Sequence, residues 1–184
     1  SRHVFKRPAP WRLSYEGTIV RRRRGRARKQ HQVLQCGVEC VGLKGPEADA
    51  EVIEVAARAC EDVGLRDFLV ELAQVKIGSE VLDHVPNGAR TKVVETLAAK
   101  DARTLETLLK QAGVVAAERK RLVMLCNLYG DRSIIADARR RLRNTAARRA
   151  LDELERVVER LESAGLGDRI AIDLGDLRRH SYYT

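Results

Sequence analysis

Two side chains on one strand of this sequence could hold a small ligand. Between His31 and Leu43, residues two apart point to the same side of a strand, which places Gln35, Gly37 and Glu39 on one face. An amide and a carboxylate then flank a glycine, whose missing side chain leaves a gap. We expect this face to form the floor of a pocket, although Glu39 could instead pair with a nearby arginine.

A dense basic run, Arg21 to Lys29 (RRRRGRARK), is the second stretch that could bind something. The chain carries a net charge of +9, but its other basic residues are spread widely. The run could grip tRNA, another polyanion or the phosphates of ATP through point charges. It could equally be a solvated turn. We favour a solvated or small-anion-binding turn over tRNA.

These residues must be positioned by two strands, Trp11 to about Arg22 and about His31 to Leu43, joined by the basic turn. On the second strand, the face opposite Glu39 is largely apolar and is expected to pack against a core. Pro46 to Gly64 has the 3–4 apolar spacing of a helix, with acidic residues in its first turn and a glycine stop. A further strand is predicted at about Phe68–Ile77.

From Ser79 to Gly165 the pattern predicts nearly continuous helix, interrupted at glycines and at one proline. The last helix has Asn144 as its expected N-cap and Gly165 beyond its end. Its apolar stripe is Leu151, Leu154, Val158 and Leu161. The chain has no Ser/His/Asp set, H-E-x-x-H or P-loop motif, so we predict no catalytic residue.

The four cysteines, Cys36, Cys40, Cys60 and Cys126, form no C-x-x-C pair and have no histidine at ligand spacing. We therefore predict no metal site and expect reduced, buried thiols, as in a cytoplasmic protein. No apolar run approaches the ~18 residues of a membrane span. The first residues lack the apolar segment of a signal peptide.

Several stretches carry a resemblance to a known family: PWRLSYEGTIVR (Pro10–Arg21), the basic loop, QCGVECVG (Gln35–Gly42) and ADAEVI (Ala48–Ile53). Together they resemble motif 2 of class II aminoacyl-tRNA synthetases, in the histidyl-tRNA synthetase version. DLGDLRRHSYYT (Asp173–Thr184) resembles that family's second histidine-site motif. Motifs 1 and 3 are missing, so we expect the chain to be part of a longer protein. The family includes the synthetase and a non-aminoacylating branch, the regulatory subunit of ATP phosphoribosyltransferase.

The resemblance implies that ATP recognition of the synthetase type has been lost. Arg21 matches the arginine that faces the α-phosphate, but Arg23 stands where the synthetase has a glutamate that reads adenine. His31 replaces a loop arginine, and Val33 replaces the aromatic residue that stacks on adenine. An arginine cannot accept a hydrogen bond from the adenine amino group. We expect no cofactor, and keep Arg21 and Arg23 as candidate phosphate- or anion-binding residues.

The same resemblance implies that the residues that bind histidine in the synthetase are retained in this chain. Gln35 and Glu39 match residues that hold the amino acid, with Glu39 suited to the α-ammonium. Arg178 matches the arginine near the substrate carboxylate, and Tyr182 and Tyr183 match the tyrosines beside the imidazole. A carboxylate for the ammonium and an arginine for the carboxylate give the polarity that an amino acid requires. The resemblance therefore implies a histidine sensor.

We predict an α+β fold: a class II synthetase-like antiparallel sheet flanked by helices, with a helical insertion. The expected divisions are residues 1–78 and 144–184 for the core and 79–143 for the insertion, and the strands after Asp168 should return to the sheet beside motif 2. The predicted function is a non-catalytic regulatory subunit of ATP phosphoribosyltransferase in histidine biosynthesis. Its expected partners are the short-form catalytic subunit and L-histidine, and histidine would act as an allosteric ligand. We expect the protein to form a homodimer within a hetero-oligomer with the catalytic subunit.

Two other functions remain open. One is the catalytic domain of an active histidyl-tRNA synthetase, whose full-length sequence would contain motif 3 and an anticodon-binding domain. The other is a binding module for RNA or another polyanion, held by Arg21–Lys29. Steeply salt-dependent RNA affinity, lost when that turn is neutralised, would favour the second.

Overall fold

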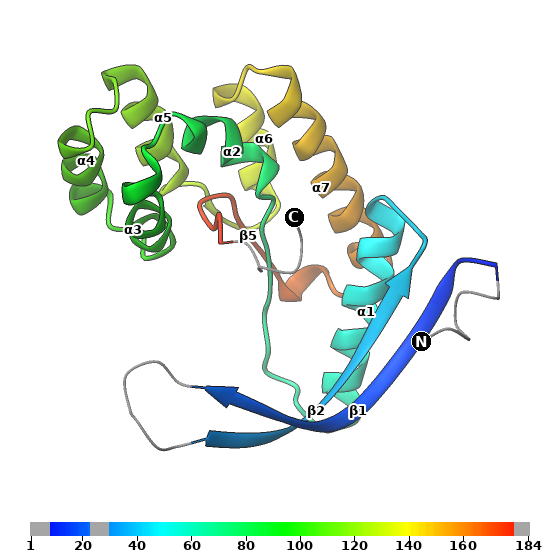
Figure 1. Cartoon of the computed structure of the whole chain (residues 1–184). Coiled ribbons are helices and arrows are strands. Elements are labelled where there is room, and N and C mark those ends of the chain that lie inside the picture. The colour runs from blue at the N-terminus through cyan, green and yellow to red at the C-terminus, as the bar shows by residue number, and fades with distance from the viewer. Residues whose placement is uncertain (1–7, 23–29, 179–184) are drawn as a thin grey trace. The chain divides into compact units, whose positions relative to one another are not determined.

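The structure is a computed structural model that describes residues 8–22 and 30–178. The chain divides into two compact units, residues 1–66 and residues 67–184. Each unit has its own helices and strands (Figure 1).

The first unit consists of a two-stranded ribbon and one helix. β1 (Trp11–Arg22) and β2 (Gln30–Val41) pair antiparallel over their whole lengths, from Trp11 opposite Val41 to Arg22 opposite Gln30. α1 (Pro46–Asp62) follows. It begins with a proline, whose missing N–H would have no partner within the helix, and the helix dipole favours the acidic residues in its first turn. Gly64, at φ +86°, lies just beyond its end. The predicted strands and helix are confirmed.

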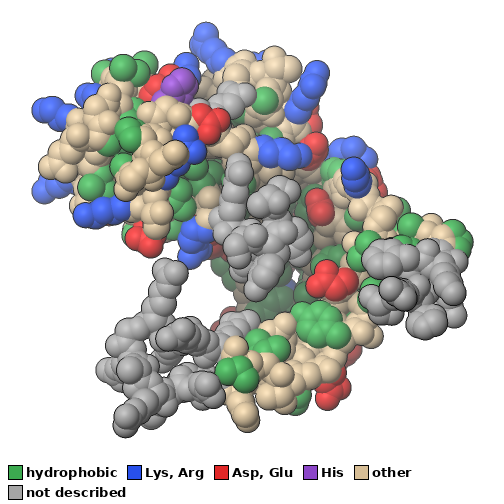
Figure 2. Space-filling view, viewed as in Figure 1, with side chains coloured by type: hydrophobic (Ala, Val, Ile, Leu, Met, Phe, Trp, Pro, Cys, Tyr) green, Lys and Arg blue, Asp and Glu red, His purple; other side chains and the backbone are tan. Residues whose placement is uncertain are grey.

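This unit has a small interior. Among its described residues, the buried ones are Pro46 and three alanines of α1, Ala48, Ala50 and Ala57. Leu34 is 70% exposed and Cys36 is also exposed, so the prediction that this face of β2 packs against a core was wrong for both. Apolar side chains of the ribbon are visible at the surface (Figure 2).

The base of the ribbon is held to α1 by an ion pair. The Arg12 guanidinium donates twice to the Glu51 carboxylate, with Nη2 2.8 Å from Oε2. This contact lowers the pKa of Glu51, because the hydrogen bonds favour its charged form. α1 therefore meets the ribbon at its base, near Arg12, whereas Leu34 further along β2 is exposed.

The second unit is mainly helical. Its helices are α2 (Lys76–Asp83), α3 (Asn87–Ala98), α4 (Ala102–Gln111), α5 (Ala116–Leu125), α6 (Ser133–Arg141) and α7 (Thr145–Ser163), followed by the 3₁₀ turn η2 (Gly167–Arg169). They match the helical stretch expected from the sequence. No helix in the described part of the chain is both long and apolar enough to cross a membrane.

Three short strands form the sheet of this unit: β3 (Val70–Leu72), β4 (Tyr129–Gly130) and β5 (Ile170–Asp173), in the order β3–β5–β4. β5 pairs parallel with β3 and antiparallel with β4. The expected return of β5 to the motif 2 ribbon was therefore wrong for the described residues. β3 is also shorter than predicted, because the chain already turns into α2 at Lys76. All four residues of β5 are buried, as in a central strand.

The core of the second unit is built from aliphatic side chains. Leu151 and Leu161 of the predicted α7 stripe are fully buried. Asn144 caps α7 by accepting a hydrogen bond from the Ala147 N–H at 2.5 Å, as predicted. The largest fully buried residues are Ile77, Leu97, Leu105, Leu109, Leu122, Leu125, Leu128, Ile135, Leu151, Leu161, Leu166 and Ile172.

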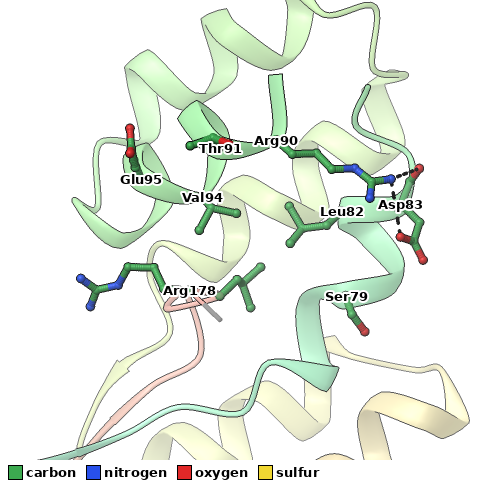
Figure 3. Close-up of a pocket in the computed structure, with 9 residues that line it drawn as sticks. Ser79, Leu82, Asp83, Arg90, Thr91, Val94, Glu95 and Arg178 are labelled. Atoms are coloured by element: carbon green, nitrogen blue, oxygen red, sulfur yellow. Dashed lines mark hydrogen bonds and ion pairs between the residues drawn. The ribbon is translucent and has the colours of Figure 1, made fainter. Parts of the chain in front are cut away.

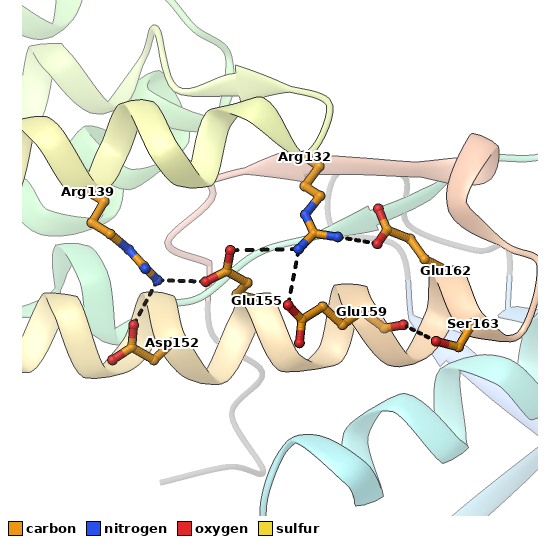
Figure 4. A network of polar contacts seen from close by, with 7 residues as sticks. All are labelled: Arg132, Arg139, Asp152, Glu155, Glu159, Glu162 and Ser163. Atoms are coloured by element: carbon orange, nitrogen blue, oxygen red, sulfur yellow. Dashed lines mark hydrogen bonds and ion pairs between the residues drawn. The ribbon is translucent and has the colours of Figure 1, made fainter.

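The face of α7 that is turned toward α6 carries a row of carboxylates bound by two arginines (Figure 4). Arg132, at the start of α6, lies 3.1 Å from Glu159 and 3.8 Å from Glu155, and also pairs with Glu162. Arg139 lies 2.7 Å from Asp152 and 2.8 Å from Glu155. The shared glutamate links the pairs into one network that ties α6 to α7. Each exposed pair contributes little alone.

Candidate functional site

The structure places the predicted ligand face of β2 under a tyrosine. Tyr15 stands opposite Gly37 in the ribbon, and a Cβ added at Gly37 would lie 2.4 Å from the tyrosine ring. Gln35 Nε2 donates to the Tyr15 hydroxyl at 2.8 Å. The gap expected at Gly37 is therefore filled by the chain's own aromatic ring, which is a correction to the sequence prediction. The pairing register was the signal that could have revealed it.

Glu39 lies on the same face and is exposed. No partner for its carboxylate is found among the described residues, and the nearby Arg12 pairs with Glu51 instead. The alternative in which an arginine neutralises Glu39 is thus not observed in the described part of the chain. A cavity of about 240 Å³ between the ribbon base and α1 has Glu39, Arg12 and Glu51 in its lining. The carboxylate is accessible to a ligand cation.

Arg178 belongs to the second unit and is aligned by a carboxylate two residues earlier. Its Nε lies 2.8 Å from Asp176 Oδ1, and its Nη2 lies 2.5 Å from Oδ2. This fork lowers the pKa of Asp176, because the hydrogen bonds from Arg178 favour the carboxylate. The Arg178 side chain is still 64% exposed. A guanidinium has five N–H donors, so donors remain for a ligand carboxylate.

A cavity of about 550 Å³ lies beside Arg178, between α2 and α3 (Figure 3). Its middle is apolar, with Leu82 and Val94 facing it. Arg90 points to one end, where it lies 3.6 Å from Asp83, and Arg178 points to the other. This cavity was not predicted from the sequence, because its lining comes from two segments that are far apart in the chain, residues 79–95 and 177–178.

The remaining predicted site residues are described in part or not at all. Arg21 lies in β1 opposite His31, and only its backbone falls within the described structure. Arg23, Tyr182 and Tyr183 lie outside the described residues. The structure places Gln35 and Glu39 in the first unit and Arg178 in the second.

The cysteines are free, and no group of three or more His, Cys, Asp or Glu residues that could hold a metal is found in residues 8–22 and 30–178. Cys126 is buried, and this burial raises the pKa of its thiol. Cys36 is exposed and Cys40 and Cys60 are half-buried, so the prediction that all four are buried was wrong.

Sequence reasoning missed the residues that support Arg178. Asp176 could have been found, because it precedes the arginine by two positions in a Gly-Asp turn. Lys100 pairs with Asp173, and 73 positions separate the two. No local pattern links such a pair.

The whole chain, residues 1–184, matches a family model described as histidyl-tRNA synthetase. Among proteins named ATP phosphoribosyltransferase regulatory subunit, that of Syntrophotalea carbinolica is 34% identical over 96% of this chain and 42% of its own length. That of Moorella thermoacetica is 35% identical over 97% of this chain and 46% of its own length. The chain thus spans less than half the length of these relatives.

Two solved structures have a similar fold. A Bacillus halodurans C protein, described as an ATP phosphoribosyltransferase regulatory subunit/histidyl-tRNA synthetase, superposes with a TM-score of 0.82 at 28% identity. The match covers 99% of this chain and 48% of that one. A chain of the Thermotoga maritima ATP phosphoribosyl transferase (HisG:HisZ) complex gives a TM-score of 0.67 at 15% identity, over 96% of this chain and 62% of that one. The predicted synthetase-like α+β fold is confirmed.

Proposed function

Because this chain belongs to the histidyl-tRNA synthetase family, we propose that it is the synthetase-like part of a regulatory subunit of ATP phosphoribosyltransferase and that it binds histidine without aminoacylating tRNA. The observation that carries the proposal is the set of relatives. Proteins named as that regulatory subunit are 30–37% identical to it over nearly the whole chain. A regulatory subunit acts on a separate catalytic subunit, which is the proposed partner.

The residues of the ribbon support the choice of this branch over the synthetase. Val33 occupies the position that the resemblance assigns to the aromatic that stacks on adenine, and it is 43% exposed. An aliphatic side chain offers no π-face to a base. Arg23 stands where the synthetase has a glutamate that accepts a hydrogen bond from adenine, and a guanidinium can only donate.

The proposed histidine contacts start from Glu39, whose exposed carboxylate would bind the α-ammonium, and from Gln35 on the same face. Tyr15 covers the glycine between them, so a ligand on this face would displace its ring. That movement costs little, because an exposed hydrogen bond between neutral groups contributes only about 1 kcal/mol. Arg178, Tyr182 and Tyr183 enter the proposal through the resemblance alone.

We extend the proposal to the assembly and its location. The protein would work in the cytoplasm, where free cysteines remain reduced, as a homodimer within a hetero-oligomer with the catalytic subunit. Histidine would shift that assembly between states by binding them unequally. The anion-binding role of Arg21 and Arg23 remains a separate proposal.

Calorimetric titration of the full-length protein with L-histidine, and separately with ATP and magnesium, tests the function. Histidine binding without ATP binding is expected. Binding of both ligands, with aminoacyl-adenylate formed on mixing, would show that the protein is a synthetase. Absence of histidine binding would refute the sensor role.

A further inference from the structure

The turn after β5 is organised around a buried carboxylate. Asp173 is 4% exposed and is the one buried charged residue among those described. Its Oδ1 accepts hydrogen bonds from Lys100 Nζ, from the Gly175 N–H at 2.8 Å and from the Asp176 N–H at 3.1 Å. A buried charge is tolerated only when it is paired and hydrogen-bonded, and this one meets both conditions.

The backbone that leads to Arg178 is fixed on both sides of this carboxylate. The Leu174 N–H donates to the Leu128 carbonyl at 3.0 Å. A Cβ at Gly175 would lie 2.8 Å from a backbone carbonyl of α5 and 2.8 Å from the Lys100 ammonium, so no side chain fits there. Leu177 is 2% exposed and packs where Gly78 of α2 has no side chain.

Arg178 is the first exposed side chain after this fixed segment. Its guanidinium is held by the Asp176 fork, and the Asp176 backbone is in turn held by Asp173. The arginine is therefore presented in one orientation by a chain of contacts that begins at Lys100.

Lys100 occupies a backbone conformation that its side chain does not favour. It lies between α3 and α4 at φ +59°, the one non-glycine residue with positive φ in residues 8–22 and 30–178. Glycine would adopt this conformation without strain, but it could not supply an ammonium. Lys100 Nζ pairs with Asp173 and lies 5.9 Å from the centre of the Tyr129 ring. We therefore attribute the lysine at this strained backbone position to its ammonium, which pairs with Asp173.

We infer that Lys100 is a positioning residue for Arg178, acting through Asp173. This inference rests on the proposed function where it assigns Arg178 to the carboxylate of the ligand. The Lys100–Asp173 pair holds the turn, the turn places Asp176, and Asp176 aims the guanidinium. Substituting Lys100 therefore misplaces Arg178 without touching the ligand.

The test compares L-histidine with L-histidinol, which has a hydroxymethyl group in place of the carboxylate. In the full-length protein, Lys100→Met should weaken histidine binding about tenfold, while histidinol binding changes by less than about twofold, because only histidine offers a partner to Arg178. Lys110→Met, on the exposed surface of α4, is the matched control and should change neither. An equal loss for both ligands, or no loss, would overturn the inference.

A second measurement needs no ligand. The Arg178 Nε–H resonance should be shifted downfield and exchange slowly, and both properties should disappear in Lys100→Met but persist in Lys110→Met. If the wild type binds no histidine while this resonance responds as stated, the proposed function fails and the positioning role stands. If the methionine variant does not fold, Lys100→Gly suits the same backbone and removes the same ammonium. An unchanged resonance in either variant refutes the inference.

Discussion

Replacing Glu39 by Gln should weaken L-histidine binding and leave the fold intact. The substitution exchanges a carboxylate for an amide of nearly the same size on an exposed position of β2. No described residue pairs with Glu39, so no ion pair within the described chain is lost. Any effect on affinity therefore reports the contact with the ligand.

The expected magnitude follows from the exposure of the site. A hydrogen bond to a charged group contributes about 1.5–3 kcal/mol. Glu39 is exposed in the first unit, where water weakens an ion pair, so the lower end applies. A loss of about 1.5 kcal/mol corresponds to a roughly tenfold rise in the dissociation constant. The loss should shrink at high salt, because screening weakens exposed pairs.

Calorimetric titration at two ionic strengths measures both effects. Glu16→Gln is the matched control: Glu16 is exposed on the opposite face of the same ribbon, across from Cys36. This control should bind histidine like the wild type. An unchanged affinity in Glu39→Gln, or an equal loss in both variants, would show that this face of the ribbon does not hold the ammonium.

Three further predictions concern single contacts. Tyr15→Phe removes the hydroxyl that accepts a hydrogen bond from Gln35 but keeps the ring over the strand. Histidine affinity should therefore rise by at most a few-fold in calorimetric titration. A loss of affinity would mean that the hydroxyl contacts the ligand. Asn144→Ala removes the α7 cap and should lower the free energy of unfolding by about 1 kcal/mol in denaturant titration, while no change would mean that the cap contributes nothing. The lowered pKa of Asp176 means that its pairing with Arg178 stabilises the fold above the usual aspartate pKa of about 3.9 and is lost as the pH falls through the lower folded value. A carboxyl NMR titration of Asp176 with a midpoint at or above about 3.9 would contradict this.

The features that the sequence predicted well are those encoded by neighbouring residues. The cap at Asn144, the glycine after α1 and the α7 stripe depend on spacing within a few turns of helix, and all three are observed. The parallel pairing of β5 with β3 depends on segments about 100 positions apart in sequence, as their Val70–Ile170 register shows. Alternation along a strand does not say which strand it will meet.

The sequence predicted the residue types of the candidate site, but it predicted the surroundings of these residues only in part. Gln35 and Glu39 share a face as the two-residue period requires. The filling of the gap at Gly37 by Tyr15 depends on the register, which a long turn leaves open. The division into a core and an insertion at residues 79–143 stays a prediction.

The contrast between the interiors of the two units decides what a melting curve of this protein reports. Every one of the largest fully buried side chains lies between Ile77 and Ile172, in the second unit. Because unfolding enthalpy scales with the amount of packed structure, the calorimetric transition belongs mainly to that unit. A ligand held by Gln35 and Glu39 alone would leave the Tm almost unchanged, whereas a ligand that also engaged Arg178 would raise it by mass action. Comparing the Tm shift with the titrated affinity therefore asks whether bound histidine engages Arg178.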